Sequence, residues 1–235
     1  MEECLVNIQH LTKIYDNNHY PAVNEMNLML PRGKIIGLLG PNGSGKTTLI
    51  KMMNGLLRPT YGSIFVCGFT VGVETKKRIS YLPDRTYLNN GSRIDEVLNM
   101  FNELYEDFEI DRAYDMLFDL GVDPRVRLQT LSKGNKEKVQ LILVMSRRAD
   151  LYILDEPIAG VDPAARDYIM RTILSAHRPD SSILLSTHLI GDIETVLDEV
   201  IFIRTGSMIL YNTAQYIRDQ YGKSVDAYFR EVFAC

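Results

Sequence analysis

One glycine-rich loop constrains the fold of this chain more than any other feature of its sequence. Residues 34–39 read Lys-Ile-Ile-Gly-Leu-Leu and predict a buried strand, and the loop Gly40–Thr47 (Gly-Pro-Asn-Gly-Ser-Gly-Lys-Thr) follows directly. A helix is predicted from about Lys46 to Leu57, before Arg58-Pro59, because proline cannot continue a helix. A strand, a glycine-rich turn and a helix in this order predict an α/β fold.

The rest of the chain alternates short β-rich runs with helical stretches, which predicts a largely parallel sheet. Between about Ile94 and Ser146 glycine is nearly absent until Gly121, and apolar residues recur at helical spacing. This stretch predicts a helical subdomain inserted into the α/β core. Further strands are predicted at residues 4–9, 23–30, 63–67, 78–82, 151–154, 183–185, 200–203 and 208–211, and further helices from Pro163 and after His188.

Composition and charge set limits on partners and compartment. The chain has 235 residues and a net charge of −4, so its charge gives no reason to expect nucleic acid as the main partner. The three cysteines are scattered and form no CxxC pair, which favours a reducing compartment. The first residues show no signal peptide, and no apolar run approaches the roughly 20 residues that span a bilayer. We therefore expect a soluble, cytosolic protein that reaches any membrane through a partner.

The loop Gly40–Thr47 matches the pattern G-x-x-x-x-G-K-[ST] in full. Glycines let the backbone wrap around phosphates with N–H groups pointing inward, and the following helix adds the positive end of its dipole. Lys46 can reach the β- and γ-phosphates, and the Thr47 hydroxyl can ligate Mg²⁺. A plain glycine turn with a surface lysine is the alternative. The candidate nucleotide-binding residues here are Gly40, Asn42, Gly43, Ser44, Gly45, Lys46, Thr47 and Thr48.

Two acids, Asp155 and Glu156, end the apolar run Leu151–Leu154. A strand buried on both faces normally carries no carboxylates, so both are expected at its C-terminal end, where ligands bind in open α/β sheets. There Asp155 would hold Mg²⁺ through water, and Glu156 would polarise a water molecule for attack on a γ-phosphate. The alternative is a pair of helix N-cap acids. The phosphate-binding loop upstream favours the hydrolytic site.

Three further segments accompany these motifs. Leu131–Asn135 (Leu-Ser-Lys-Gly-Asn) precedes a helical run, Ala159–Pro163 (Ala-Gly-Val-Asp-Pro) follows Glu156, and Ser186–His188 (Ser-Thr-His) follows a predicted strand. The ordered set, from Leu5 to about Tyr211, resembles the nucleotide-binding domain of ABC ATPases. No single motif is as specific as this order.

The resemblance implies a P-loop NTPase core with a mainly parallel sheet, an antiparallel β subdomain and an inserted α-helical subdomain. A single ABC ATPase domain would then cover residues 1–235. Its parts would be 1–83 with 150–212 (core and β subdomain), 84–149 (helical subdomain) and 213–235 (C-terminal helical tail).

The resemblance also implies that the chain binds ATP with Mg²⁺ and hydrolyses the ATP. Tyr15 matches an aromatic residue that stacks on adenine, although an ordinary strand aromatic is the alternative. Glu156 matches the catalytic carboxylate, and His188 matches a histidine that contacts the γ-phosphate and orients the water. Lys46 completes the catalytic set. Whether Glu156 acts alone as a general base or in a pair with His188 stays open.

A second subunit follows from the same resemblance. Ser132 and Gly134 match a signature segment that faces the ATP of the other subunit, and a serine with free backbone at a helix N-terminus is physically an anion site. Asp162 matches an inter-subunit aspartate; an N-cap before Pro163 is the alternative. We expect a homodimer or heterodimer that two ATP molecules join and hydrolysis releases.

The sequence departs from the family pattern in two places. Leu-Ser-Lys-Gly-Asn replaces the usual Leu-Ser-Gly-Gly-Gln, so Lys133 adds positive charge and Asn135 has a shorter reach. Asp84 stands where the family has a glutamine that touches Mg²⁺ and the attacking water. Asp84 joins Thr47 and Asp155 as a candidate magnesium ligand, although it adds negative charge beside a triphosphate. Both variants, together with Glu-Pro-x-Ala-Gly-Val-Asp-Pro at residues 156–163, resemble the single-domain ATPases of bacterial multidrug and antibiotic-peptide exporters.

A transporter motor needs a membrane permease. The resemblance implies that cytoplasmic helices of the permease dock in a groove between the core and the helical subdomain, and that the ATPase lies on the inner face of the cell membrane. The expected contacts are Tyr87, Leu88, Val97, Met100 and Phe101, with a role in the subdomain core as the alternative. A non-transport ABC ATPase acting on ribosomes, DNA ends or cofactor assembly is the second hypothesis. Such proteins usually have two ATPase domains or long coiled coils, and this sequence shows neither. A P-loop kinase or GTPase would leave Leu131–Asn135 and His188 unexplained.

Overall fold

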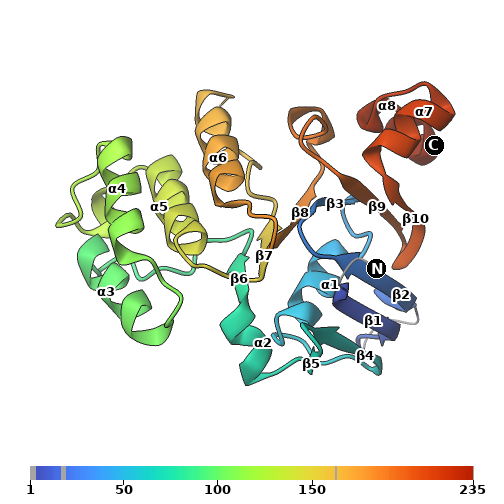
Figure 1. The fold of residues 1–235 in the computed structure, drawn as a ribbon, viewed down its shortest axis with the longest axis horizontal. Helices are drawn as coiled ribbons and strands as arrows, with labels where there is room; N and C mark the ends of the chain where they lie inside the picture. The colour runs from blue at the N-terminus through green and yellow to red at the C-terminus, as the bar shows by residue number, and fades with distance from the viewer. Residues whose placement is uncertain (1–3, 17–19, 162, 235) are drawn as a thin grey trace.

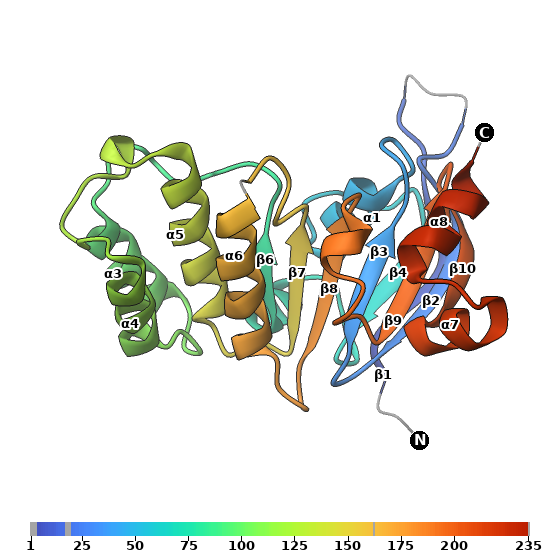
Figure 2. The same cartoon turned by 90° about the horizontal axis from the view of Figure 1, so that it is seen from above.

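A six-stranded sheet with the strand order β10-β9-β3-β8-β7-β6 lies at the centre of the computed structural model, which describes residues 4–16, 20–161 and 163–234. The five strands from β9 to β6 are parallel, and β10 is antiparallel to β9 at one edge. Figure 2 shows these strands side by side. Their bounds are β3 Ile35–Leu39, β6 Ile79–Leu82, β7 Leu151–Asp155, β8 Ser182–Thr187, β9 Glu199–Arg204 and β10 Ser207–Thr213.

A second, antiparallel sheet has the order β2-β1-β4-β5 and packs with α1 on one face of the first. Alternation along β3 explains the contact: Ile36 and Leu38 join the core shared with this sheet, while Ile35 and Leu39 face the opposite core. The bounds are β1 Cys4–Lys13, β2 Val23–Pro31, β4 Tyr61–Val66, β5 Phe69–Thr70 and α1 Lys46–Met53.

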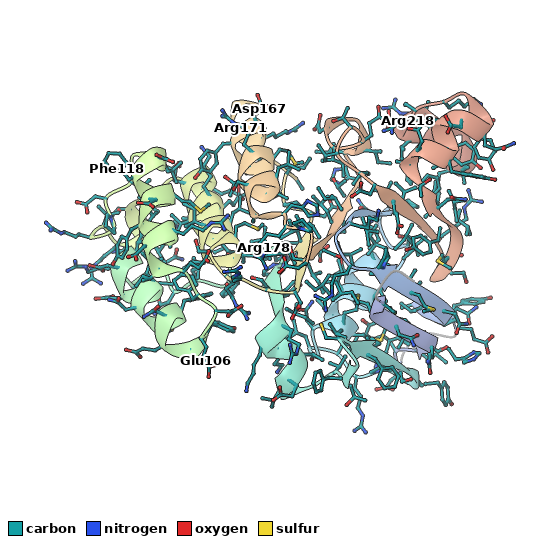
Figure 3. All side chains as sticks on the ribbon, viewed as in Figure 1. Glu106, Phe118, Asp167, Arg171, Arg178 and Arg218 are labelled. Carbon is teal, nitrogen blue, oxygen red and sulfur yellow. The ribbon has the colours of Figure 1, made fainter. Side chains whose placement is uncertain are left out.

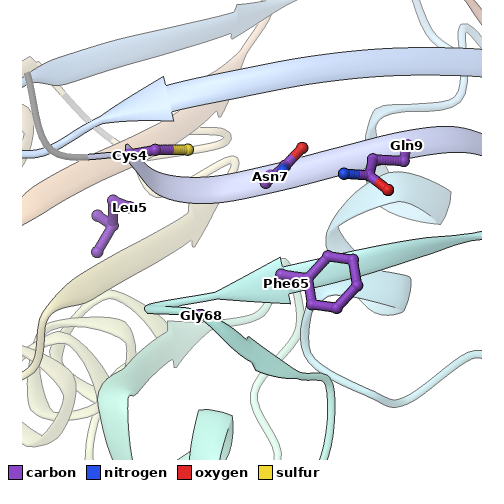
Figure 4. A pocket seen from close by; sticks show the side chains of 6 residues that line it. All are labelled: Cys4, Leu5, Asn7, Gln9, Phe65 and Gly68. Carbon is purple, nitrogen blue, oxygen red and sulfur yellow. The ribbon is translucent and has the colours of Figure 1, made fainter. Parts of the chain in front are cut away.

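A shallow hollow lies on the antiparallel sheet (Figure 4). Its lining residues come from β1, β4 and the turn after β4, and none of them is a candidate site residue from the sequence. They are Cys4, Leu5, Asn7, Gln9, Phe65 and Gly68.

Helices cover the other face of the six-stranded sheet, as Figure 1 shows. The C-terminal end of α5 and the helix α6 pack there beside β7 and β8, and α7 and α8 pack beside β9 at the far end. The bounds are α5 Lys133–Met145, α6 Pro163–Ala176, α7 Ala214–Tyr221 and α8 Val225–Phe233.

The region between β6 and β7 has its own hydrophobic core, formed by α3, α4 and α5. Leu98, Leu117 and Leu143, one from each helix, are at most 1% exposed in this core. Phe118 of α4 projects outward instead and is 85% exposed (Figure 3). The bounds are α2 Val73–Arg78, α3 Ile94–Leu104, α4 Ile110–Leu120 and a 3₁₀ turn at Leu128–Thr130.

The structure confirms the predicted fold class, with a mainly parallel sheet, an antiparallel sheet and an inserted helical region. Two predicted helices differ. The helix from Lys46 ends at Met53 instead of Leu57, because Asn54 caps it and Gly55 adopts a left-handed conformation with φ of 69°. In the described part of the chain, no helix has the length and apolar character needed to cross a membrane.

The helix predicted after His188 is wrong. A single 3₁₀ turn, Ile190–Asp192, replaces it. Gly191 and the β-branched residues of the segment disfavour a helix. The buried side chains of Ile190 and Ile193 instead anchor an irregular connection from β8 back to β9.

Candidate nucleotide-binding site

Parallel strand pairing brings three segments that contain candidate site residues to one edge of the sheet. β3 and β7 both pair with β8, in a register that sets Leu39 opposite Thr187 and Asp155 opposite Ser186. The residues that follow these strands therefore meet: the loop after β3, Glu156 after β7 and His188 after β8. This is the edge at which ligands bind in open α/β sheets.

The loop after β3 is possible only with glycine at two of its positions. Gly45 has φ of 109°, and a Cβ atom there would lie 2.4 Å from the carbonyl oxygen of Ala22. A Cβ atom at Gly40 would lie 2.4 Å from the carbonyl oxygen of Ile203. The first turn of α1 carries Lys46, Thr47 and Thr48 and no acidic residue, so its N–H groups are suited to an anion.

A cavity of about 270 Å³ lies over this loop. It brings together nine residues that the sequence predicted: Asn42, Gly43, Ser44, Gly45, Lys46, Thr47, Thr48, Asp84 and Glu156. Ala22 also lines it. No sequence signal marked Ala22, because its carbonyl reaches the loop only through tertiary packing.

Lys46 is poised within the loop. Its side chain is buried, and Nζ donates hydrogen bonds to the carbonyl oxygens of Gly40 at 2.7 Å and Pro41 at 3.3 Å. Burial lowers the pKa of Lys46, and the charges of Glu156 and Asp155 partly offset that effect. Carbonyl oxygens that hold an ammonium group can be replaced by phosphate oxygens when a nucleotide enters.

Asp155 is a buried carboxylate, and one of its two oxygens accepts no hydrogen bond from the described residues. Its Oδ1 accepts a hydrogen bond from Ser186 Oγ at 2.5 Å, whereas Oδ2 has no hydrogen-bond partner within the described residues. Burial raises its pKa, and the nearby Asp84 charge adds to this, while the hydrogen bond from Ser186 works in the opposite direction. A cation would satisfy the free oxygen.

The donor set at this position fits Mg²⁺, which prefers one or two carboxylates together with phosphate and water oxygens. The described residues contain no group of three or more His, Cys, Asp or Glu that could hold a metal ion by themselves. Phosphate oxygens would therefore have to complete the shell that Thr47 and Asp155 begin. Asp84 lines the same cavity.

Glu156 and His188 form a direct pair: Glu156 Oε2 lies 2.9 Å from His188 Nδ1. Glu156 has a left-handed backbone with φ of 53°, which is uncommon for a residue with a side chain. Its N–H donates to the Ser186 carbonyl oxygen at 3.0 Å, which helps to hold that conformation. Ser186 thus positions both acids, a role that its place before Thr187-His188 had not indicated.

Tyr15 lies beside this site without lining the cavity. Its hydroxyl is 3.3 Å from Thr48 Oγ1, and its ring is partly exposed. Lys13 Nζ lies 5.5 Å from the ring centroid. The position leaves ring surface next to the first turn of α1.

The Leu131–Asn135 segment stands apart from the cavity. Ser132 is exposed and caps α5 by accepting a hydrogen bond from the Asn135 N–H at 3.2 Å. A Cβ atom added at Gly134 would meet no described atom within 4 Å. Nothing in the described part of the chain therefore requires glycine there on steric grounds. Asp162 lies outside the described residues.

A phosphate-binding loop at a helix N-terminus, a buried acid with a free oxygen and a Glu–His pair at one sheet edge define the class as a P-loop ATPase. The family model described as "ABC transporter" matches residues 23–159, more than half of the chain. This chain belongs to the ABC transporter family and is an ATP-binding, ATP-hydrolysing member of it.

Individual relatives agree with the family. The chain is 30% identical over 225 residues to the uncharacterized ABC transporter ATP-binding protein YhaQ of Bacillus subtilis, and the match covers 93% of this chain and 74% of that protein. It is 31% identical to the SkfA peptide export ATP-binding protein SkfE of the same species, covering 87% of each. Human ATP-binding cassette sub-family A member 2 is 32% identical, but the match spans only 9% of that protein.

Solved structures agree as well. An ATP-binding subunit of an ABC transporter superposes with a TM-score of 0.87 at 28% identity, covering 97% of this chain and 99% of that one. A dimeric ATP-binding cassette in a post-hydrolysis state, bound to ADP and Pi, gives a TM-score of 0.78 at 17% identity, covering 89% and 98%. The second likeness concerns the fold.

Proposed function

We propose that this ATPase drives export through a separate integral-membrane permease, working with a second ATPase subunit on the cytoplasmic face of the cell membrane. Two relatives support export. One is named a peptide export ATP-binding protein, and another, the linearmycin resistance ATP-binding protein LnrL of Bacillus subtilis, is 28% identical and is matched over 69% of its length. The observation that supports a permease partner is a groove on the surface of the protein.

This groove, of about 690 Å³, lies where the helical region meets the strand β6. Met100, Leu104 and Tyr87 line it and are about half or more exposed, which is unusual for apolar side chains unless a partner covers them. Phe101 also lines it but is only 7% exposed and belongs to the helical core. Leu88 and Val97 are buried in the helical core instead, as the alternative interpretation of the sequence predicted.

The charges around the groove indicate what kind of segment fits. Lys51, Lys76 and Arg85 lie on its lining, against one acid, Asp84. An amphipathic cytoplasmic segment of the permease, with an apolar face and acidic residues beside it, would complement both properties.

The hydrolytic reaction follows from the cavity. The ATP phosphates would take the place of the carbonyl oxygens on Lys46 and accept hydrogen bonds from the first turn of α1. Glu156, oriented by His188, would accept a proton from a water molecule as its oxygen bonds to the γ-phosphorus. The bond to the bridging oxygen breaks, giving ADP and inorganic phosphate. Bound Mg²⁺, held by Thr47 and Asp155, would neutralise charge on the phosphates.

A second subunit would complete the pocket. Ser132 and Gly134 lie at the exposed N-terminus of α5, and the open space at Gly134 suits close approach by a phosphate group from another protomer. The first exposed turn of α5 and the cavity would then meet only across a dimer interface, which links ATP binding to association.

One substitution tests the permease contact. Met100→Glu places a charge among the apolar side chains of the groove, at a residue that does not line the nucleotide cavity. It should reduce recovery of a co-expressed candidate permease at least tenfold in detergent pull-downs, because binding would bury the new carboxylate against an apolar segment. Basal ATP hydrolysis should not change.

Phe118→Glu is the matched control, because Phe118 is an exposed apolar residue of the same helical region outside the groove. Its pull-down should equal that of the unmodified protein. Equal recovery with Met100→Glu would refute the groove as the permease site. Isolation with ribosomes in place of a membrane protein would favour the non-transport alternative.

A further inference from the structure

One arginine connects the two stretches of chain that follow Glu156 and His188. Arg166, in the second turn of α6, donates from Nε to the carbonyl oxygen of Val161 at 3.0 Å and from Nη1 to Asp192 Oδ2 at 2.7 Å. Val161 follows Glu156 by five positions and Asp192 follows His188 by four. The guanidinium therefore lies between the chain leaving each member of the Glu–His pair.

Both stretches are already held in one hydrophobic core, but their apolar contacts do not fix direction. Ile158 and Val161 on one side, and Ile190 and Ile193 on the other, belong to the same buried cluster. Hydrophobic contact is non-directional, whereas a planar guanidinium donates along fixed directions. Arg166 supplies the directional link between the two stretches.

The ion pair between Arg166 and Asp192 is only partly shielded from water, so it acts through its direction more than through its strength. The side chain of Arg166 is 28% exposed and half-buried, whereas that of Asp192 is 41% exposed and stays in contact with water. The two residues are 26 positions apart in sequence, and the bond therefore joins separate segments instead of stabilising one helix. A pair of this kind couples the segments more strongly than an ion pair between fully exposed side chains.

We propose that Arg166 is a positioning residue that keeps the Glu156 and His188 side chains at the separation needed for their pairing. This proposal rests on the catalytic roles proposed above for Glu156 and His188. Its bonds in the described part of the chain reach neither side chain; they hold the main chain at Val161 and the side chain of Asp192, in the stretches that follow the pair. Because Val161 also precedes the segment expected to face a second subunit, movement there would be transmitted to the segment after His188.

The test compares Arg166→Gln, Asp192→Ala and the double variant in the full chain. Each single variant should lower kcat for ATP roughly tenfold, because small displacements of catalytic groups have effects of this order. The KM for ATP and its equilibrium affinity should change less than about twofold, because the phosphate-binding loop is untouched. The double variant should be no slower than Arg166→Gln, since one link is lost in every case.

Arg166→Lys tests whether the two fixed donor directions of the guanidinium group are needed. Lysine keeps the charge but cannot donate along two fixed directions, so its kcat should fall between those of Arg166→Gln and the unmodified protein. Arg171→Gln is the control: Arg171 lies on the same helix with an exposed side chain (Figure 3) and bonds only to the carbonyl of its helix neighbour Asp167 within the described residues. Its kcat should equal that of the unmodified protein.

A second readout separates this proposal from the catalytic assignment. Hydrogen exchange of backbone amides at residues 187–194 and 158–161 should quicken in Arg166→Gln and not in Arg171→Gln. Quicker exchange with unchanged kcat would mean that the link exists but that Glu156 and His188 do not form the catalytic pair. Unchanged exchange, or rate losses of the single variants that multiply in the double variant, would overturn the positioning role.

Discussion

Arg147 gives the sharpest test of how the helical region is attached to the core. It follows α5, and its side chain is 3% exposed. Nε and Nη2 bond to the two carboxylate oxygens of Asp107, both at 3.0 Å. Nη1 bonds to the Ile79 carbonyl oxygen at 2.7 Å and Nη2 to that of Lys77 at 2.6 Å, at the end of α2. One guanidinium thus joins three segments, and it also stacks on Tyr105 at 3.9 Å.

The substitution Arg147→Met keeps most of the volume and removes every donor. Breaking a buried ion pair from one side typically costs about 3–5 kcal/mol. Asp107 is 25% exposed and can regain some water, so the lower end applies, at about 3 kcal/mol. Two carbonyl groups that lose their donor add roughly 1 kcal/mol. The expected loss is about 4 kcal/mol, or about 10 °C in Tm for a chain of this size.

Urea unfolding followed by circular dichroism measures the loss, because the chain contains no tryptophan for fluorescence. Arg148→Met is the control: it makes the same chemical change one position further on, at an exposed side chain. That variant should change stability by less than about 0.5 kcal/mol. A loss below about 1 kcal/mol for Arg147→Met, or equal losses for both variants, would contradict the role of Arg147 as the junction.

Four further variants test the site and the junction at Arg147. Burial raises the pKa of Asp155 in the folded protein above its value in the unfolded chain. The unfolded chain therefore releases this proton first, and the stability of the protein falls as pH rises between the two pKa values. Asp155→Asn should raise the free energy of unfolding by roughly 1 kcal/mol at neutral pH and by less near pH 4, in urea titrations at both pH values. Equal gains at both would contradict this. Glu156→Gln should keep ATP affinity and slow phosphate release by about 10²-fold or more, and hydrolysis at the full rate would contradict its catalytic role. Lys46→Ala should abolish ATP binding in equilibrium titrations, and full affinity would contradict its role in binding phosphate. Tyr152→Phe removes a buried hydroxyl that donates to the Arg147 carbonyl oxygen at 2.6 Å, and should cost about 1–2 kcal/mol in the same unfolding assay, whereas no loss would show that the bond is not stabilising.

The local sequence pattern was enough to predict a segment's structure wherever that structure depends on residues close together in the chain. The buried strand before Gly40, the glycines of the loop and the helix from Lys46 follow from apolar runs and steric limits within twenty residues. The helical spacing of apolar residues between Ile94 and Ser146 likewise predicted helices with a separate core. The helix expected after His188 failed because burial of Ile190 and Ile193, and the return to β9, override a weak helical pattern.

The sequence by itself therefore determined the class of fold, the phosphate-binding loop and the identity of the acids and histidine beside it, because these depend on residue type and short spacing. Only the tertiary structure decided how the parts are tied together. Arg147 reaches carbonyl groups about 70 positions away, and Arg166 reaches Asp192 across 26. Contacts of this kind depend on which strands become neighbours, and no local pattern records that choice.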